Sequence, residues 1–187
     1  MILRLFRLIA CQLLLAFACA QAQASDGIEI TRNIIEASED GYRLNANFEF
    51  QLPHGLEQAL QMSVPLYFTT EIDVTRPRWW WTDERAVSQR QTVRIDYDVL
   101  TRQYHVRVMG SLQQNFTTLD EALSMIRRPS RWLFAPKGTL EPGKTYNVTL
   151  RMFLDRDFLQ KPLQVNAFNN ADWRLTSNKK NFTYKAE

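Results

Sequence analysis

Apolar and polar residues alternate strictly along residues 42–50, and this period of two constrains the fold more than any other feature of the sequence. Tyr42, Leu44, Ala46 and Phe48 are separated by arginine and asparagine residues. Because successive side chains of a strand point to opposite faces, the pattern predicts a strand with one buried and one solvated face. The same alternation recurs over residues 28–34, 66–74, 93–99, 104–108 and 146–154. The sequence therefore predicts a mostly β chain.

A turn motif suggests how these strands are arranged. Residues 140–148 read Leu-Glu-Pro-Gly-Lys-Thr-Tyr-Asn-Val, and Pro142-Gly143 suits a type II turn. The segment resembles the strand-turn-strand corner of fibronectin type III and related immunoglobulin-like sandwiches, in which the Tyr146 hydroxyl would return to the backbone a few residues upstream. We therefore expect an antiparallel immunoglobulin-like or fibronectin-like β-sandwich with two short helices.

The two helices are expected over residues 54–62 and after Thr118. Leu56, Ala59 and Leu60 have helical spacing, and Thr118 with Glu121 forms a capping-box pattern. The irregular tail beyond Pro162 is expected to add two strands, from apolar residues that include Leu163, Val165, Ala167, Trp173, Leu175, Phe182 and Tyr184.

The chain is expected to form a single domain over residues 25–187. The two helical segments resemble each other, which leaves two organisations open: independent amphipathic helices, or a duplicated unit with a boundary near residues 88–91. That boundary would lie in a polar break expected from Thr82 to Gln91.

The segments 93–99 and 104–108 are expected to form a hairpin. If Val99 lies opposite Tyr104, Asp98 falls opposite His105 and Asp96 opposite Arg107. Opposite charges on facing strands stabilise a sheet, so this register satisfies the apolar and the charge patterns together.

Residues 1–24 are interpreted as a secretory signal peptide, cleaved near Ala24. Arg4 and Arg7 precede a short apolar run that ends in overlapping Ala-x-Ala sites. One alternative is an uncleaved signal anchor, through which alone the chain is expected to reach a membrane. Another alternative is lipidation at Cys11 or Cys19. Without residues 1–24 the chain has no cysteine, and its formal net charge falls from +3 to +1 with the two arginines. We therefore expect a periplasmic protein without disulfide or zinc-thiolate site that binds no nucleic acid.

No catalytic, metal or cofactor site is expected. Outside the signal peptide the only histidines are His54 and His105. Residues 138–145 match the phosphate-loop pattern, but a strand rather than a helix is predicted to follow, so no phosphate cradle is expected. Carboxylates are plentiful, and a glycosidase-like pair among Asp83, Glu84, Asp155 and Asp157 remains an alternative.

Trp79, Trp80 and Trp81 are consecutive and follow Arg76 and Arg78. Adjacent residues of a strand face opposite sides, so the three rings cannot share one core. Trp80 has the parity of the apolar residues of segment 66–74 and is expected to be buried, with Trp79 and Trp81 facing the other way if no bulge intervenes at Pro77. A core role, a partner surface and a membrane-interface belt all remain open. Arg76, Arg78, Trp79 and Trp81 are the candidate partner-binding residues, for an envelope protein or a glycan.

Several phrases of the sequence resemble one known family. They are residues 78–83 (Arg-Trp-Trp-Trp-Thr-Asp), 100–104 (Leu-Thr-Arg-Gln-Tyr), 119–123 (Leu-Asp-Glu-Ala-Leu), 162–165 (Pro-Leu-Gln-Val) and 173–177 (Trp-Arg-Leu-Thr-Ser). The family is a proteobacterial group of exported proteins known as a domain of unknown function, numbered four-three-nine-zero. The resemblance implies a periplasmic protein with no assigned activity and a connection to envelope signalling. We therefore expect a non-enzymatic binding module of the cell envelope; a cell-wall or glycan-directed hydrolase and a glycan-binding module are the alternatives.

Overall fold

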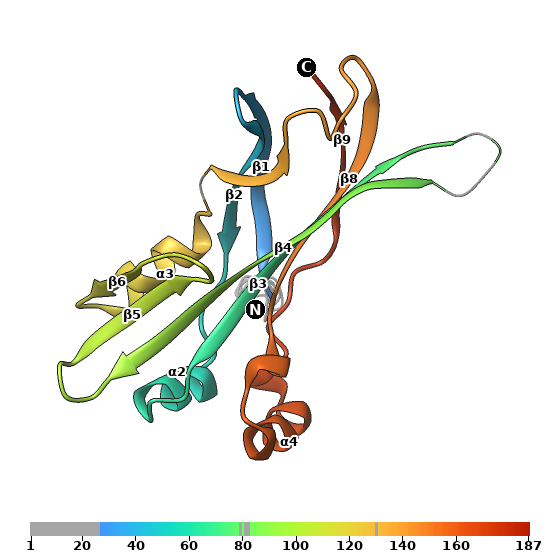
Figure 1. Cartoon of the computed structure of the whole chain (residues 1–187). Helices are drawn as coiled ribbons and strands as arrows, with labels where there is room; N and C mark the ends of the chain where they lie inside the picture. Colours follow the sequence, from blue (N-terminus) through green and yellow to red (C-terminus); the bar gives the residue numbers. More distant parts are fainter. Residues whose placement is uncertain (1–26, 79, 81–82, 130) are drawn as a thin grey trace, which may run out of the picture.

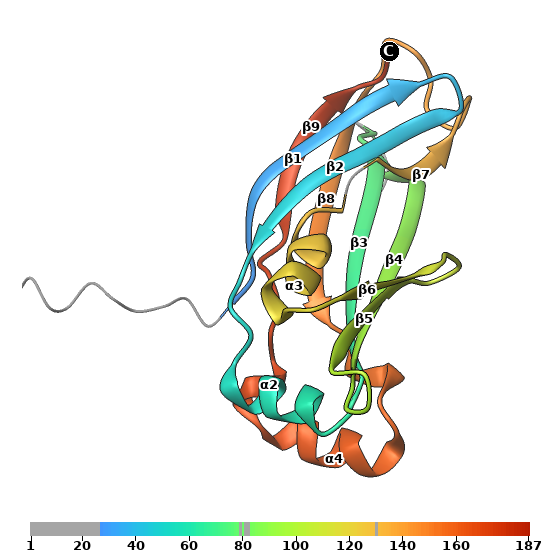
Figure 2. The same ribbon diagram turned by 90° about the vertical axis from the view of Figure 1, so that its left-hand side faces the viewer.

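The computed structural model describes residues 27–78, 80, 83–129 and 131–187. Within them the chain is mostly β, and its strands form two antiparallel sheets that pack against each other (Figures 1 and 2). The predicted mostly β, antiparallel class is confirmed. The closer likeness to an immunoglobulin-like or fibronectin-like sandwich stays a prediction.

The larger sheet has six strands in the order β6-β5-β4-β3-β8-β9. Their bounds are β3 (Leu66–Arg76), β4 (Glu84–Asp98), β5 (Gln103–Val108), β6 (Gln113–Phe116), β8 (Thr145–Leu154) and β9 (Lys180–Lys185). The expected polar break from Thr82 to Gln91 is wrong from Glu84 onward, because β4 already begins there and residues 88–91 lie inside it. Polar residues are accommodated in this part of β4 because most of their side chains are exposed to solvent.

The smaller sheet contains β1 (Glu29–Ser38), β2 (Gly41–Glu49) and β7 (Trp132–Pro136), in that order. The alternation of inward-facing and outward-facing side chains is not continuous along β1, although the spacing of its isoleucines suggested that it would be. A bulge between Ile30 and Arg32 shifts the register, so Ile35, and not Ile34, lies opposite the buried Leu44.

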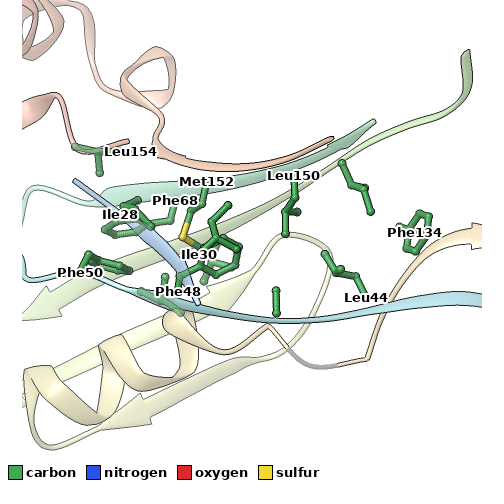
Figure 3. Close-up of a cluster of buried hydrophobic side chains, with 14 of the residues drawn as sticks. Ile28, Ile30, Leu44, Phe48, Phe50, Phe68, Phe134, Leu150, Met152 and Leu154 are labelled. Atoms are coloured by element: carbon green, nitrogen blue, oxygen red, sulfur yellow. The ribbon is translucent and has the colours of Figure 1, made fainter. Parts of the chain in front are cut away.

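The core lies between the two sheets. Figure 3 shows Leu44 and Phe48 of β2 pointing toward the other sheet, where Phe68 of β3 and Met152 of β8 lie across from Phe48. These four side chains are almost fully buried. Burying one such side chain stabilises the fold by about 1.5–3 kcal/mol.

Helix α3 (Leu119–Arg127) packs between β2 and the β5–β6 hairpin (Figure 2). Its inner face buries Ala122, Leu123 and Ile126. The predicted capping box is confirmed: the Glu121 backbone N–H donates to Thr118 Oγ1 at 3.3 Å, and Glu121 Oε2 accepts from the Thr118 N–H.

Two further α-helices lie together at one end of the sandwich (Figure 1). They are α2 (His54–Gln61) and α4 (Lys161–Asn169), accompanied by the short 3₁₀ turns η2 (Arg156–Phe158) and η3 (Ala171–Trp173). The strand expected around Leu163 and Val165 is therefore wrong, and the described chain has three α-helices instead of two. Pro162 sits in the first turn of α4, where its fixed φ favours a helix and its missing N–H costs nothing. The strand expected at Phe182 and Tyr184 is β9.

The β4–β5 hairpin forms as expected, but its register differs from the prediction by two residues. Tyr97, and not Val99, lies opposite Tyr104, and Asp96 lies opposite His105. Asp98 explains the shift, because its Oδ1 accepts from the Leu100 and Thr101 backbone N–H groups at 2.8 and 3.3 Å. This carboxylate thereby stabilises the turn instead of pairing across the strands.

Candidate binding surface on the β3–β4 hairpin

The far end of the β3–β4 hairpin projects beyond the rest of the six-stranded sheet (Figure 1). The two strands pair from Leu66 and Ile95 out to Arg76 and Glu84. β5 pairs with β4 only over Val93–Asp98, so β4 lacks a described neighbour on that side for most of its first half. We call residues 76–78, 80 and 83–92 the arm. β3 ends at Arg76 because Pro77 follows and cannot donate a ladder hydrogen bond.

Arg76 links the arm to the body of the protein. Its guanidinium donates to Glu84 Oε2 across the hairpin at 2.6 Å and to Glu141 Oε1, in the turn before β8, at 2.6 Å. Arg78 donates to the same oxygen of Glu84. The hydrogen bond to Glu84, followed by that to Glu141, raises the pKa of Arg76. Arg78, followed by Arg76, lowers the pKa of Glu84. Both shifts favour the charged forms of Arg76 and Glu84.

A tyrosine corner holds Glu141 in place for this contact. The Glu141 backbone N–H donates to the Tyr146 hydroxyl at 2.9 Å, and the Tyr146 ring is buried in the core. Gly143 has φ +77°, a left-handed conformation that favours glycine in the turn between them. The expected return of the Tyr146 hydroxyl to the upstream backbone is confirmed.

A groove of about 530 Å³ runs between the base of the arm and the start of β8. It is lined by Arg76, Pro77, Arg78, Trp80, Lys144 and Thr145. Trp80 is 65% exposed. Among the described residues, Lys144 makes no ion pair, and no carboxylate lines the groove. The groove therefore offers an aromatic surface beside an ammonium group.

The structure brings two of the four predicted site residues together, since Arg76 and Arg78 both contact Glu84. Trp79 and Trp81 lie outside the described residues. The expectation that Trp80 is buried is wrong. It was derived by extending the alternation of β3, but the strand ends before Pro77 and the chain leaves the sheet there. The alternation of side chains in β3 therefore does not predict the side on which Trp80 lies.

Sequence reasoning did not identify Glu84, Glu141 and Lys144 as parts of this surface. Glu84 was assigned to a polar break and to an alternative carboxylate pair, and Lys144 was considered in a rejected phosphate-loop pattern and in the tyrosine-corner segment. Lys144 and Glu141 belong to the tyrosine-corner segment, so that motif was the signal for their position. The motif alone does not say that this turn lies beside the arm. The pairing of β3 with β8 places it there.

Asp155 and the two histidines outside the signal peptide make contacts within the fold. Asp155 is buried, accepts from Thr69 Oγ1 at 3.0 Å and caps η2 through the Asp157 N–H. His105 lies 3.5 Å from Asp96, and His54 contacts Gln58. The described part of the chain contains no cluster of potential metal ligands and no helix that is long and apolar enough to cross a membrane.

A family model described as a domain of unknown function (DUF4390) matches residues 25–183. No curated protein and no solved structure matches the chain.

Proposed function

The chain belongs to the domain-of-unknown-function family DUF4390, and we propose that it is a non-enzymatic binding module of the bacterial cell envelope whose arm contacts a partner protein. The observation that supports this most directly is the exposure of Trp80 on the projecting arm, beside two arginines held by Glu84. Tryptophan and arginine are the side chains most enriched at the energetic centres of protein interfaces.

The geometry of the arm favours binding for a second reason. Arg76 is fixed by two carboxylates, so its side chain would lose little further freedom on contact with a partner. Contacts that are ordered before binding cost less conformational entropy than flexible ones. Lys144 at the edge of the groove adds a cation that makes no ion pair with the described residues, which favours a partner surface that carries carboxylates.

Export to the periplasm is part of the same proposal. It is supported by the basic, apolar and small-residue order of residues 1–24, and by the family match, which begins at residue 25. A connection with envelope signalling would follow if the partner proves to be a membrane sensor protein.

Site-specific photocrosslinking in living cells tests the proposal. A photoreactive amino acid replaces Trp80 in one variant and Leu100 in a control, because Leu100 is 95% exposed on a different hairpin turn. We expect a discrete crosslinked protein from position 80 alone. The crosslinked protein is then purified, and Trp80→Ala should weaken its affinity for this chain at least tenfold. Identical crosslinks from both positions, or unchanged affinity of the variant, would refute a binding role for the arm.

Glycan binding is the second candidate, and the groove is the observation that favours it. An exposed indole beside Lys144 could stack on a sugar ring that carries an acidic group. Soluble peptidoglycan fragments would then quench tryptophan fluorescence, and the Trp80→Phe variant would lose that part of the quenching. Quenching that persists in the variant would assign it to another tryptophan and exclude this candidate.

A further inference from the structure

The two sheets end in four strands, and three of them carry features that discourage pairing with another chain. β6 has four residues, β7 has five and ends at Pro136, and β9 has lysine at both of its ends. Short length, proline and lysine are the usual protections of an exposed sheet edge. β1 has ten residues and contains neither proline nor lysine. Its bulge between Ile30 and Arg32 protects only the start of the strand, so the regular stretch beyond the bulge is the edge best suited to accept a further strand.

The bulge in β1 determines which of its side chains face outward. Asn33 and Ile35 lie opposite the buried residues Ala46 and Leu44, so they share the inner face. Arg32, Ile34 and Glu36 alternate with them and face the other side. The outward face of β1 thus presents a cation, an apolar side chain and an anion at intervals of two residues.

Neither charge of this pattern is paired within the described part of the chain. Arg32 makes no ion pair there. Glu36 lies across from Arg43, but the Arg43 guanidinium bonds to Asp40 instead. Both side chains are exposed. Arg32 and Glu36 are therefore free to meet charges on another molecule.

The pattern is complementary to itself in one orientation. When a second β1 lies antiparallel with Ile34 opposite Ile34, Arg32 of each copy falls opposite Glu36 of the other. A parallel in-register pair would place Arg32 opposite Arg32 and Glu36 opposite Glu36, which is unfavourable. We propose that two copies of this chain associate through antiparallel pairing of β1 about a two-fold axis, so that two three-stranded sheets become one six-stranded sheet.

The available edge fits this register. The start of β1 is already occupied, because the Ile28 N–H donates to the Thr176 carbonyl at 3.2 Å and Ile28 bridges to Ser177. The proposed pairing is centred on Ile34, beyond this contact, and needs only residues 32–36. The lysines of β9 disfavour pairing of that edge, so β1 is the strand through which the copies join.

Sedimentation velocity of purified protein over a range of concentrations tests the proposal through charge reversal. Arg32→Glu and Glu36→Arg each create two like-charge pairs across the axis, and each should raise the dimer dissociation constant by at least about tenfold. The double variant R32E/E36R restores opposite charges and should return the constant to within about threefold of the wild-type value. Arg102→Glu, in the exposed β4–β5 turn, is the matched control and should leave it unchanged.

Circular dichroism establishes that every variant is folded before its association is compared. A wild-type protein that is monomeric at all concentrations overturns the proposal, as does a folded double variant that associates no better than the single variants. Ile34→Lys gives an independent check, because it places two ammonium groups against each other at the axis and should abolish the dimer. None of these variants alters the arm. Loss of the dimer in these variants would therefore leave partner binding through Trp80 unaffected, and the two proposals can be tested separately.

Discussion

The guanidinium of Arg76 donates a hydrogen bond to Glu141 at 2.6 Å, across 65 positions of sequence. Arg76 is the last residue of β3, and Glu141 lies in the turn that precedes β8. The same guanidinium holds Glu84, the first residue of β4. One side chain therefore connects both strands of the arm to the body of the sandwich, next to the last β3–β8 pair at Thr75 and Asn147.

Replacing Arg76 by alanine should loosen the arm without unfolding the protein. The variant frees Glu84 and Glu141 from this contact, while the core beneath them is unchanged. We expect faster amide hydrogen exchange in peptides that cover residues 84–92 and little change in the midpoint of thermal unfolding, because exposed ion pairs add little to global stability. Arg102→Ala, in the opposite turn, should leave exchange in the arm unaltered. Equal exchange in both variants would show that Arg76 does not hold the arm.

Tyr146→Phe should destabilise the fold by about 1 kcal/mol, because the Glu141 N–H loses its acceptor in the tyrosine corner. Tyr184→Phe is the matched control. The Tyr184 hydroxyl is buried and makes no hydrogen bond within the described structure. Its removal should leave the free energy of unfolding unchanged or slightly higher, as measured by urea denaturation. A larger loss for Tyr184→Phe than for Tyr146→Phe would contradict both assignments.

Acid should weaken the fold partly through Asp40. Arg43, and then Ser38, lower the pKa of this carboxyl from 3.8 to about 2. A carboxyl whose pKa is lower in the folded state stabilises the fold at pH values above its unfolded pKa, and this contribution disappears as the pH falls towards 2. Asp40→Asn should therefore flatten the loss of stability between about pH 5 and pH 2. Urea denaturation at several pH values measures it, and an unchanged slope would argue against the contact.

The sequence predicted those elements whose pattern is long and whose ends are marked. β2, β3 and β8 have clear alternation, and α3 has a capping box, so all four were located correctly. The errors fall where a local interaction overrides the pattern. A bulge shifted Ile34 outward, and Asp98 bonded the turn and moved the hairpin register. Pro162 began a helix in a segment where three apolar residues alone cannot distinguish helix from strand.

The candidate surface was only half predictable for a related reason. Arg76 and Arg78 stand next to the tryptophans in sequence, so composition was enough to select them. Glu141 and Lys144 reach the arm through the pairing of β3 with β8, which alternation alone does not specify. The predicted burial of Trp80 depended on where β3 ends. Because β3 ends before Pro77, its alternation of buried and exposed side chains does not extend to Trp80.

The hydrogen bond between Thr69 and Asp155 should be the most costly of the polar contacts to break. Asp155 is only 8% exposed, and Thr69 Oγ1 lies 3.0 Å from its carboxylate and 2.8 Å from Thr92 Oγ1. Asp155→Ala should cost about 2–3 kcal/mol, because the Thr69 hydroxyl and the Asp157 backbone N–H lose their acceptor, whereas the exposed Asp157→Ala should cost less. Urea denaturation of Thr69→Val, Asp155→Ala and the double variant gives the coupling energy, expected at about 1 kcal/mol. Strictly additive losses would mean that the two side chains act independently, with Asp155 stabilising η2 alone.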